Sequence, residues 1–119
     1  MKNGTHSYLE DPRNENIKIY INGEIFPRHD AKISVFDSGF LLGDGVWEGI
    51  RLLNEKLVFL QEHLDRLFFG AKQLNIDIGH SPEQLTEIIY RTLDENSMEN
   101  DVHIRLIVSR GLKKTPYQH

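Results

Sequence analysis

Apolar and polar residues alternate along 17–26. Isoleucine occupies every second position of 17–21, and Ile25 and Phe26 follow the pair Asn22-Gly23. An Asn-Gly pair between two alternating stretches is typical of a β-hairpin with a two-residue turn, because both turn positions require a positive φ. We therefore predict a hairpin over 17–26.

Alternation returns in two later stretches. Residues 46–53 and 56–59 flank the pair Asn54-Glu55, which predicts a second hairpin around a less diagnostic turn. A further strand is predicted over 102–110. One face of that strand carries Val102, Ile104, Leu106 and Val108, and the opposite face carries His103, Arg105 and Ile107.

The period becomes helical from Leu60. Apolar residues recur at three- and four-residue spacing over 60–74, which predicts a helix with one apolar face. The run Ser81-Pro82-Glu83-Gln84 is a capping box with proline at the first helical position, and it predicts the start of a second helix. The apolar stripe of the second helix comprises Leu85, Ile88, Ile89 and Leu93.

This order of elements predicts an α+β fold, a mainly antiparallel sheet with two helices packed on one side. A chain of 119 residues has the length for one such core. We expect a flexible tail at 1–16, because that segment is polar and aperiodic. The predicted domain covers 17–110, and 111–119 is the expected start of an interdomain loop.

The stretch 37–51 is the most distinctive of the chain. The run Gly43-Asp44-Gly45 permits positive φ and predicts a loop that leads into a strand. On that strand Trp47, Gly49 and Arg51 share one face, where the glycine leaves room for something flat or for the close approach of another backbone. The alternative is a twisted strand whose glycine serves packing alone.

Composition argues against several classes of function. The net charge is -4 with mixed signs, and no basic cluster suggests nucleic acid or a membrane surface as a partner. No apolar run approaches the roughly 18 residues needed to span a bilayer, and cysteine is absent, so we expect a cytoplasmic protein. The six histidines lack the spacing of a metal site, and no serine lies in a nucleophile elbow.

Arg51, Arg66 and Arg105 lie on different predicted elements. The planar guanidinium of arginine suits phosphate and carboxylate groups, so these side chains are candidates for binding a polyanion. Gly70, one turn beyond Arg66, would let a ligand or another backbone approach the helix. The alternative, unrelated surface or ion-paired arginines, stays open on spacing alone.

Three motifs resemble those of a known family. They are Gly43-Asp44-Gly45-Val46-Trp47-Glu48-Gly49-Ile50-Arg51, then His63-Leu64-Asp65-Arg66-Leu67 with Ala71-Lys72, and then Ile104-Arg105-Leu106-Ile107-Val108-Ser109-Arg110-Gly111. In this order they are similar to the amino-terminal domain of class IV, fold-type IV pyridoxal-phosphate aminotransferases. That family includes branched-chain and D-amino-acid aminotransferases and aminodeoxychorismate lyase. The resemblance covers 17–119 and is nearest to the branched-chain enzymes.

The resemblance implies pyridoxal 5'-phosphate as cofactor and assigns roles to five residues. Arg66 matches the arginine that holds the cofactor phosphate. Trp47 and Gly49 match positions in the substrate pocket, and Arg51 and Arg105 match positions near the substrate carboxylate. The resemblance implies no catalytic residue and no metal ligand within this chain.

Two further positions differ from the branched-chain pattern. Leu42 and His103 stand where branched-chain enzymes carry tyrosine, the first of which reaches the partner subunit's site. Lys113 and Lys114 fall in the mobile interdomain loop of the family.

The family's Schiff-base lysine lies in a second domain, beyond the position of His119. The resemblance therefore implies a longer parent enzyme, a homodimer that exchanges an amino group between an amino acid, branched-chain by resemblance, and a 2-oxo acid. The 119-residue chain alone is expected to be inactive. Two alternatives stay open: a non-catalytic binding or dimerisation module of the same fold, and an aminodeoxychorismate lyase, which uses the same cofactor to eliminate pyruvate.

Overall fold

The computed structural model describes residues 10–113 and divides the chain into two compact units, 1–31 and 32–119. Every strand pairing is antiparallel, but the strands form two separate sheets, one of two strands and one of three. The predicted class, α+β with an antiparallel sheet, is confirmed.

The first unit is built around the predicted hairpin. Its elements are η1 (Pro12–Asn14), β1 (Lys18–Ile21), β2 (Glu24–Pro27) and η2 (Arg28–Asp30). Ile21 pairs with Glu24 across the turn, and Asn22 and Gly23 have φ of 49° and 96°. These positive values are those of the two-residue turn that the Asn-Gly pair predicts.

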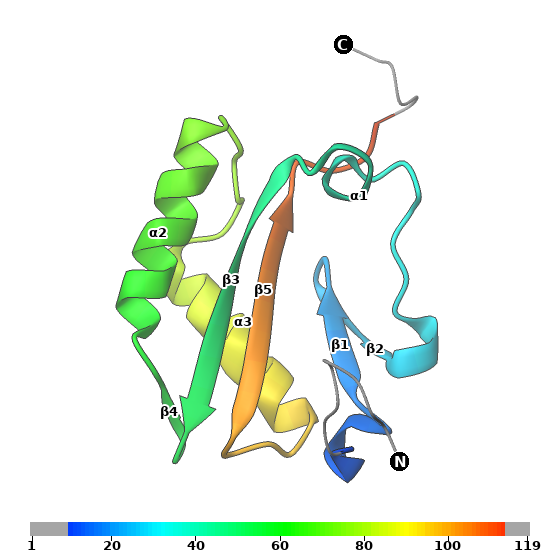
Figure 1. The fold of residues 1–119 in the computed structure, drawn as a ribbon, viewed down its shortest axis with the longest axis vertical. Helices are drawn as coiled ribbons and strands as arrows, with labels where there is room; N and C mark the ends of the chain where they lie inside the picture. The colour runs from blue at the N-terminus through cyan, green and yellow to red at the C-terminus, as the bar shows by residue number, and fades with distance from the viewer. Residues whose placement is uncertain (1–9, 114–119) are drawn as a thin grey trace, which may run out of the picture. The chain divides into compact units, whose positions relative to one another are not determined.

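The second unit contains the remaining elements (Figure 1). They are α1 (Ser38–Leu42), β3 (Gly45–Leu53), β4 (Lys56–Leu57), α2 (Leu60–Gln73), α3 (Pro82–Glu95) and β5 (Val102–Ser109). The strand order is β4-β3-β5, with β3 in the centre. The second hairpin is confirmed, and Asn54 and Glu55 make its turn with φ of 50° and 67°.

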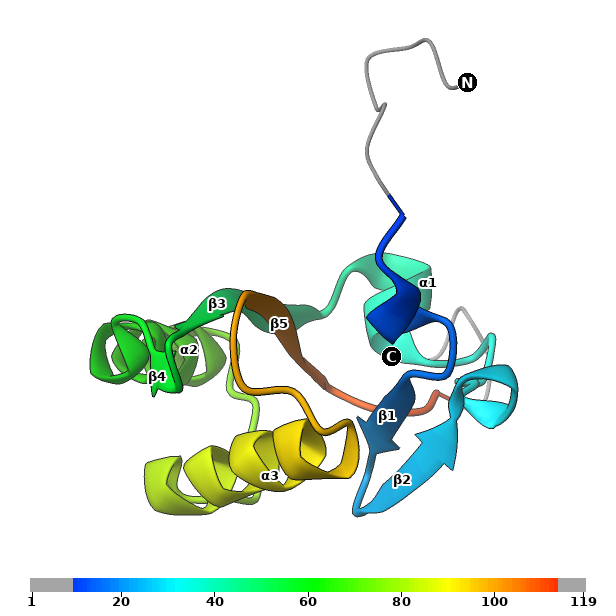
Figure 2. The same cartoon turned by 90° about the horizontal axis from the view of Figure 1, so that it is seen from below.

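Helices α2 and α3 pack on one face of the three-stranded sheet, as predicted (Figure 2). One buried cluster joins Ile50 and Leu52 of β3 to Ile89 and Leu93 of α3, and a second is built by Leu64, Leu67 and Leu85 of the two helices. Helix α3 starts at the predicted capping box, in which Ser81 and Gln84 exchange side-chain to backbone hydrogen bonds.

The short helix α1 was not predicted. Its N-cap is Asp37, whose Oδ2 accepts a hydrogen bond of 3.1 Å from the backbone N–H of Phe40, and it ends at Gly43, where φ is 67°. A helix of five residues buries too small a face to leave an apolar period in the sequence. Phe40 and Leu42 accordingly remain 65% and 56% exposed.

The predicted boundaries at 1–16 and 111–119 fall partly outside the described residues. Within 10–16, Asp11 caps the 3-10 turn η1. Within 111–113, Leu112 forms an isolated antiparallel bridge with Asp37, and the N–H of Lys113 donates to the carbonyl of Phe36 at 2.9 Å. The tail and the interdomain loop remain predictions. None of the helices in the described part of the chain is long and apolar enough to cross a bilayer.

Candidate functional site

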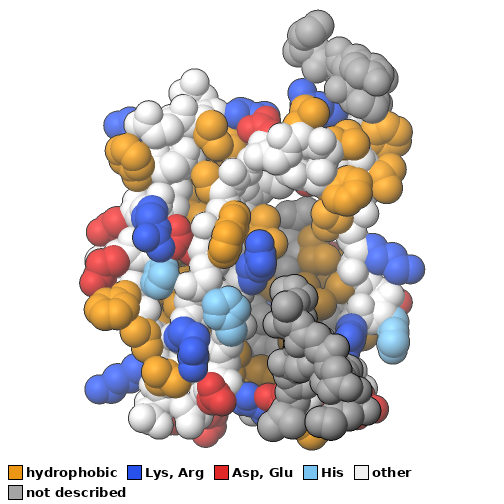
Figure 3. All heavy atoms as spheres, viewed as in Figure 1, with side chains coloured by type: hydrophobic (Ala, Val, Ile, Leu, Met, Phe, Trp, Pro, Cys, Tyr) orange, Lys and Arg blue, Asp and Glu red, His pale blue; other side chains and the backbone are white. Residues whose placement is uncertain are grey.

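The sheet face opposite the two helices carries most of the predicted site residues. Alternation places Trp47, Gly49 and Arg51 of β3 on this face, and their cross-strand partners on β5 are Ile107, Arg105 and His103 in that order. In Figure 3 hydrophobic, basic and histidine side chains lie together over these two strands. The structure therefore brings together four of the five predicted residues.

Trp47 and Arg105 stack on this face. The guanidinium carbon of Arg105 lies 4.2 Å from the centroid of the Trp47 ring. Such cation–π contacts contribute about 0.5–1 kcal/mol at exposed positions, and Trp47 is 56% exposed. The pair offers an apolar ring edge beside a cation, an arrangement suited to an organic anion.

The space above Gly49 is filled by a side chain of the domain itself. A Cβ at Gly49 would lie 3.0 Å from Cε1 and 3.1 Å from Nε2 of His103. The flat group for which the sequence predicts room is therefore, in this structure, the imidazole of His103. His103 stands between Arg51 and Arg105 on the site face, a position that the prediction of site residues missed.

Arg51 has a weak partner. Its Nη2 lies 3.2 Å from Oδ1 of Asp101, and both side chains are more than half exposed. Exposed ion pairs of this kind contribute roughly 0–1 kcal/mol, so little free energy is lost when Arg51 turns to another anion.

Arg66 does not join the other four. It lies on α2 and bonds the carboxylate of Glu48, which is on the opposite, helix-covered face of β3. Arg66 Nε donates to Glu48 Oε2 at 2.8 Å, and Nη2 donates to Oε1 at 2.6 Å. The Arg66 side chain is nevertheless 69% exposed, whereas that of Glu48 is 7% exposed.

His63 completes this cluster on the helix-covered face. Its Nδ1 lies 2.7 Å from Glu48 Oε1. Because an ionised carboxylate only accepts, His63 Nδ1 carries the hydrogen and donates it. The 3.4 Å approach of Arg66 Nη2 to the same nitrogen joins two donors and is no hydrogen bond. The Glu48 carboxylate thus receives three hydrogen bonds, two of them from Arg66.

These contacts lower the pKa of Glu48. The hydrogen bonds from Arg66 bring the pKa from 4.5 to about 2, against the opposing effect of burial, and the hydrogen bond from His63 adds to the lowering. Glu48 therefore stays ionised throughout the neutral and mildly acidic range.

A carboxyl with a lowered pKa stabilises the fold most above its unfolded-state pKa. The stabilisation from Glu48 should be complete above about pH 5 and should be lost as the pH falls toward 2, amounting to about 3 kcal/mol. Urea unfolding of the wild type and of Glu48→Gln at pH 5.5 and pH 2.5 measures this term. We expect a smaller acid-induced loss in the variant, and equal losses would contradict the assignment.

Sequence reasoning placed Glu48 on the apolar face of its strand but drew no consequence from it. The signal was available, because a carboxylate between Val46 and Ile50 on a buried face requires a partner. Which residue supplies that partner depends on the packing of α2.

Ser109 also acquires partners that the sequence does not indicate. Its Oγ donates to Asp37 and accepts the N–H groups of Gly39 and Gly111 at 3.0 and 3.1 Å. These bonds tie the end of β5 to α1, and none of them comes from a histidine. Within residues 10–113 no group of three His, Asp or Glu side chains could hold a metal ion.

Residues 45–118 match the family model described as Amino-transferase class IV. The chain belongs to the class IV aminotransferase family. This match confirms the predicted resemblance, and it covers β3, α2 and β5, the elements that carry the candidate site.

Relatives in this family are named for two kinds of substrate. The chain is 47% identical over 107 residues, 90% of its length, to a branched-chain-amino-acid aminotransferase-like protein of Arabidopsis thaliana. It is 39% identical over 83 residues, 70% of its length, to the D-alanine aminotransferase of Staphylococcus epidermidis. The chain spans 19% and 29% of these relatives.

A solved class IV structure shares the fold. It is the branched-chain amino acid aminotransferase from Escherichia coli, 27% identical to this chain, with a TM-score of 0.75. The superposition covers 82% of this chain and 34% of that one.

The residues of this chain fit the phosphate group of pyridoxal 5'-phosphate at Arg66. Glu48 occupies Nε and Nη2 of its guanidinium, Nη1 has no hydrogen bond within the described residues, and the side chain is largely exposed. A guanidinium held on one edge and open on another suits a phosphate oxygen.

Proposed function

We propose that this chain is the amino-terminal part of a pyridoxal-phosphate aminotransferase that exchanges an amino group between a branched-chain amino acid and a 2-oxo acid. Arg66 holds the cofactor phosphate, and Trp47, Gly49, Arg51 and Arg105 form the substrate side of the site. The cofactor supplies the carbonyl carbon that accepts the amino group. The observation that carries the proposal is the sheet face on which Arg105 stacks on the exposed ring of Trp47 beside Arg51.

This face has the chemistry that the proposed substrates require. Arg51 and Arg105 offer guanidinium forks for a carboxylate, and the ring of Trp47 and the aliphatic group of Ile107 offer a contact for an apolar side chain. These two apolar side chains are 56% and 64% exposed. A further domain that covers this face would exclude water from the bound substrate.

A homodimer is the assembly we propose for the parent protein. In support, several large apolar side chains on and around α1 are exposed, and such patches commonly mark interfaces. They are Ile33, Val35, Phe40, Leu42 and Leu112. The cytoplasmic location remains a prediction.

An amino-transfer assay tests the function. The complete encoded protein is incubated with L-valine, L-leucine or D-alanine and 2-oxoglutarate, and the 2-oxo acid product is measured. We expect L-branched-chain donors to be used, Arg105→Gln to raise their KM about tenfold, and the matched Arg91→Gln on α3 to leave KM unchanged. The 119-residue chain alone should show no turnover.

Other outcomes assign the alternatives. Faster use of D-alanine would make the protein a D-amino-acid aminotransferase, and release of pyruvate from aminodeoxychorismate would make it a lyase. Absence of turnover from the complete protein would leave a binding module. Turnover by the isolated chain would contradict its proposed inactivity.

A further inference from the structure

Glu48 is the buried charged side chain of the described residues, at 6% exposure. Its neighbours on the same face of β3, Val46 and Ile50, pack in the two apolar clusters. Taking a carboxylate out of water costs several kcal/mol before its partners offset that cost. The position therefore carries a charge where an apolar side chain would pack at lower cost.

Stability does not account for this charge. Replacing a buried ion pair by apolar residues of similar volume is often neutral or stabilising. Arg66 itself needs no buried partner, because its side chain is 69% exposed and water would solvate it. We therefore looked for what Glu48 does to Arg66 beyond neutralising it.

The hydrogen bonds from Arg66 to Glu48 fix the plane of the guanidinium. Nε and Nη2 both donate to Glu48, one to each carboxylate oxygen. A two-point fork of this kind allows neither rotation nor tilt of the planar group. The edge that carries Nη1 is consequently held facing away from Glu48.

His63 fixes the carboxylate in turn. Its Nδ1–H donates to the same Oε1 that accepts from Arg66 Nη2, at 2.7 Å, and its side chain is only 19% exposed. His63 and Arg66 are three residues apart on α2, so that one helix supplies all three donors. The carboxylate thus links β3 to α2 and presents Arg66 in one orientation.

We propose that Glu48 is a positioning residue for the cofactor phosphate, orienting the Arg66 guanidinium so that its Nη1 edge meets the phosphate. The inference rests on the proposed role of Arg66. An unrestrained arginine loses rotamer freedom when it binds an anion, whereas a guanidinium already held by Glu48 loses less.

Charge and orientation predict opposite effects of removing Glu48. The negative charge of Glu48 lies beside the anion site and by itself weakens anion binding, so its loss should tighten binding if only charge matters. If Glu48 orients Arg66, its loss should weaken binding. Glu48→Gln, which keeps the size and removes the charge, separates the two.

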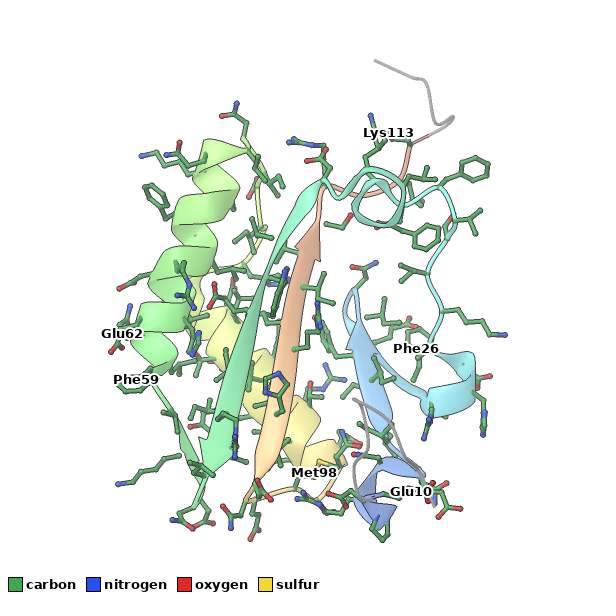
Figure 4. The ribbon with its side chains drawn as sticks, in the orientation of Figure 1. Glu10, Phe26, Phe59, Glu62, Met98 and Lys113 are labelled. Atoms are coloured by element: carbon green, nitrogen blue, oxygen red, sulfur yellow. The ribbon has the colours of Figure 1, made fainter. Side chains whose placement is uncertain are left out.

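The test uses pyridoxine phosphate and pyridoxine, which differ in the phosphate and lack an aldehyde that would react with lysines. Their binding to the 119-residue chain is measured by calorimetry, and the Arg66 Nε–H resonance is followed by NMR. We expect Glu48→Gln to weaken pyridoxine phosphate binding about tenfold and to leave pyridoxine binding unchanged. The matched control is Glu62→Gln, because Glu62 is exposed on the same helix as Arg66 and points away from the sheet (Figure 4). This substitution should weaken neither ligand.

Equal or tighter binding of pyridoxine phosphate by Glu48→Gln would overturn the inference while leaving the role of Arg66 intact. A wild type that does not discriminate between the two ligands, with no shift of Arg66, would overturn both. In the double variant Glu48→Gln/Arg66→Lys, a loss equal to that of Arg66→Lys alone is expected, because Glu48 acts through Arg66. Additive losses would contradict that route.

Should Glu48→Gln fail to fold, Arg66→Lys with Glu48 intact replaces it. Lysine keeps the positive charge but lacks the two-point fork. We expect a loss of about tenfold in affinity for pyridoxine phosphate, and wild-type affinity would overturn the inference.

Discussion

Replacing Gly45 by alanine should lower the free energy of unfolding by about 2–3 kcal/mol. An alanine Cβ at this position would lie 2.6 Å from the carbonyl oxygen of Val108 and 3.3 Å from Cα of Ser109. Both atoms belong to the backbone of β5, which cannot move without disturbing the β3–β5 ladder. The smaller entropy of the unfolded chain offsets only about 0.4–1 kcal/mol of this cost.

Gly49→Ala is the matched control, because Gly49 lies on the same strand and the same face. The atoms nearest its Cβ are those of the His103 ring, which is an exposed side chain and can rotate away. We expect a change within about 1 kcal/mol. Urea unfolding followed by the emission of Trp47, the single tryptophan, measures both variants. Equal effects of the two substitutions would contradict this account of the strand contact.

Arg66→Ala should destabilise the domain strongly although the Arg66 side chain is largely exposed. The substitution leaves the buried carboxylate of Glu48 with His63 as its remaining partner, and an incompletely compensated buried charge is costly. We expect the melting temperature to fall by on the order of 10 °C. Differential scanning calorimetry at pH 7 gives the value.

Two comparisons isolate the cause. Arg51→Ala removes a guanidinium whose partner Asp101 is itself exposed, so we expect a shift of no more than about 3 °C. Adding Glu48→Leu to Arg66→Ala removes the buried charge and should restore most of the lost stability. An unchanged melting temperature in Arg66→Ala, or no recovery in the double variant, would contradict the importance of Glu48 burial.

The regular elements of the second unit could be predicted because their signals are local. The alternation of 102–110 places Arg105 on one face and Leu106 on the other, and the capping box at Ser81 marks the start of α3. Each of these depends on residues a few positions apart. Helix α1 has the cap residues Asp37 and Gly43 but no apolar face of its own, so periodicity could not reveal it.

The candidate site was predicted in part for the same reason. Alternation alone places Trp47, Gly49 and Arg51 on one face of β3, and the structure agrees. The position of Arg105 over Trp47 and of His103 over Gly49 depends on the register between β3 and β5. Register between strands so far apart in the sequence is set by the whole packed sheet, which local patterns do not encode.

The sequence by itself determined the class of fold, the faces of β3 and β5, and the family, because these follow from periodicity, caps and contiguous motifs. Only the tertiary structure decided that Arg66 bonds Glu48 on the helix-covered face, apart from the residues around Trp47. That decision belongs to packing: a buried carboxylate takes whichever donors the neighbouring helix brings within hydrogen-bond distance, and α2 brings Arg66 and His63.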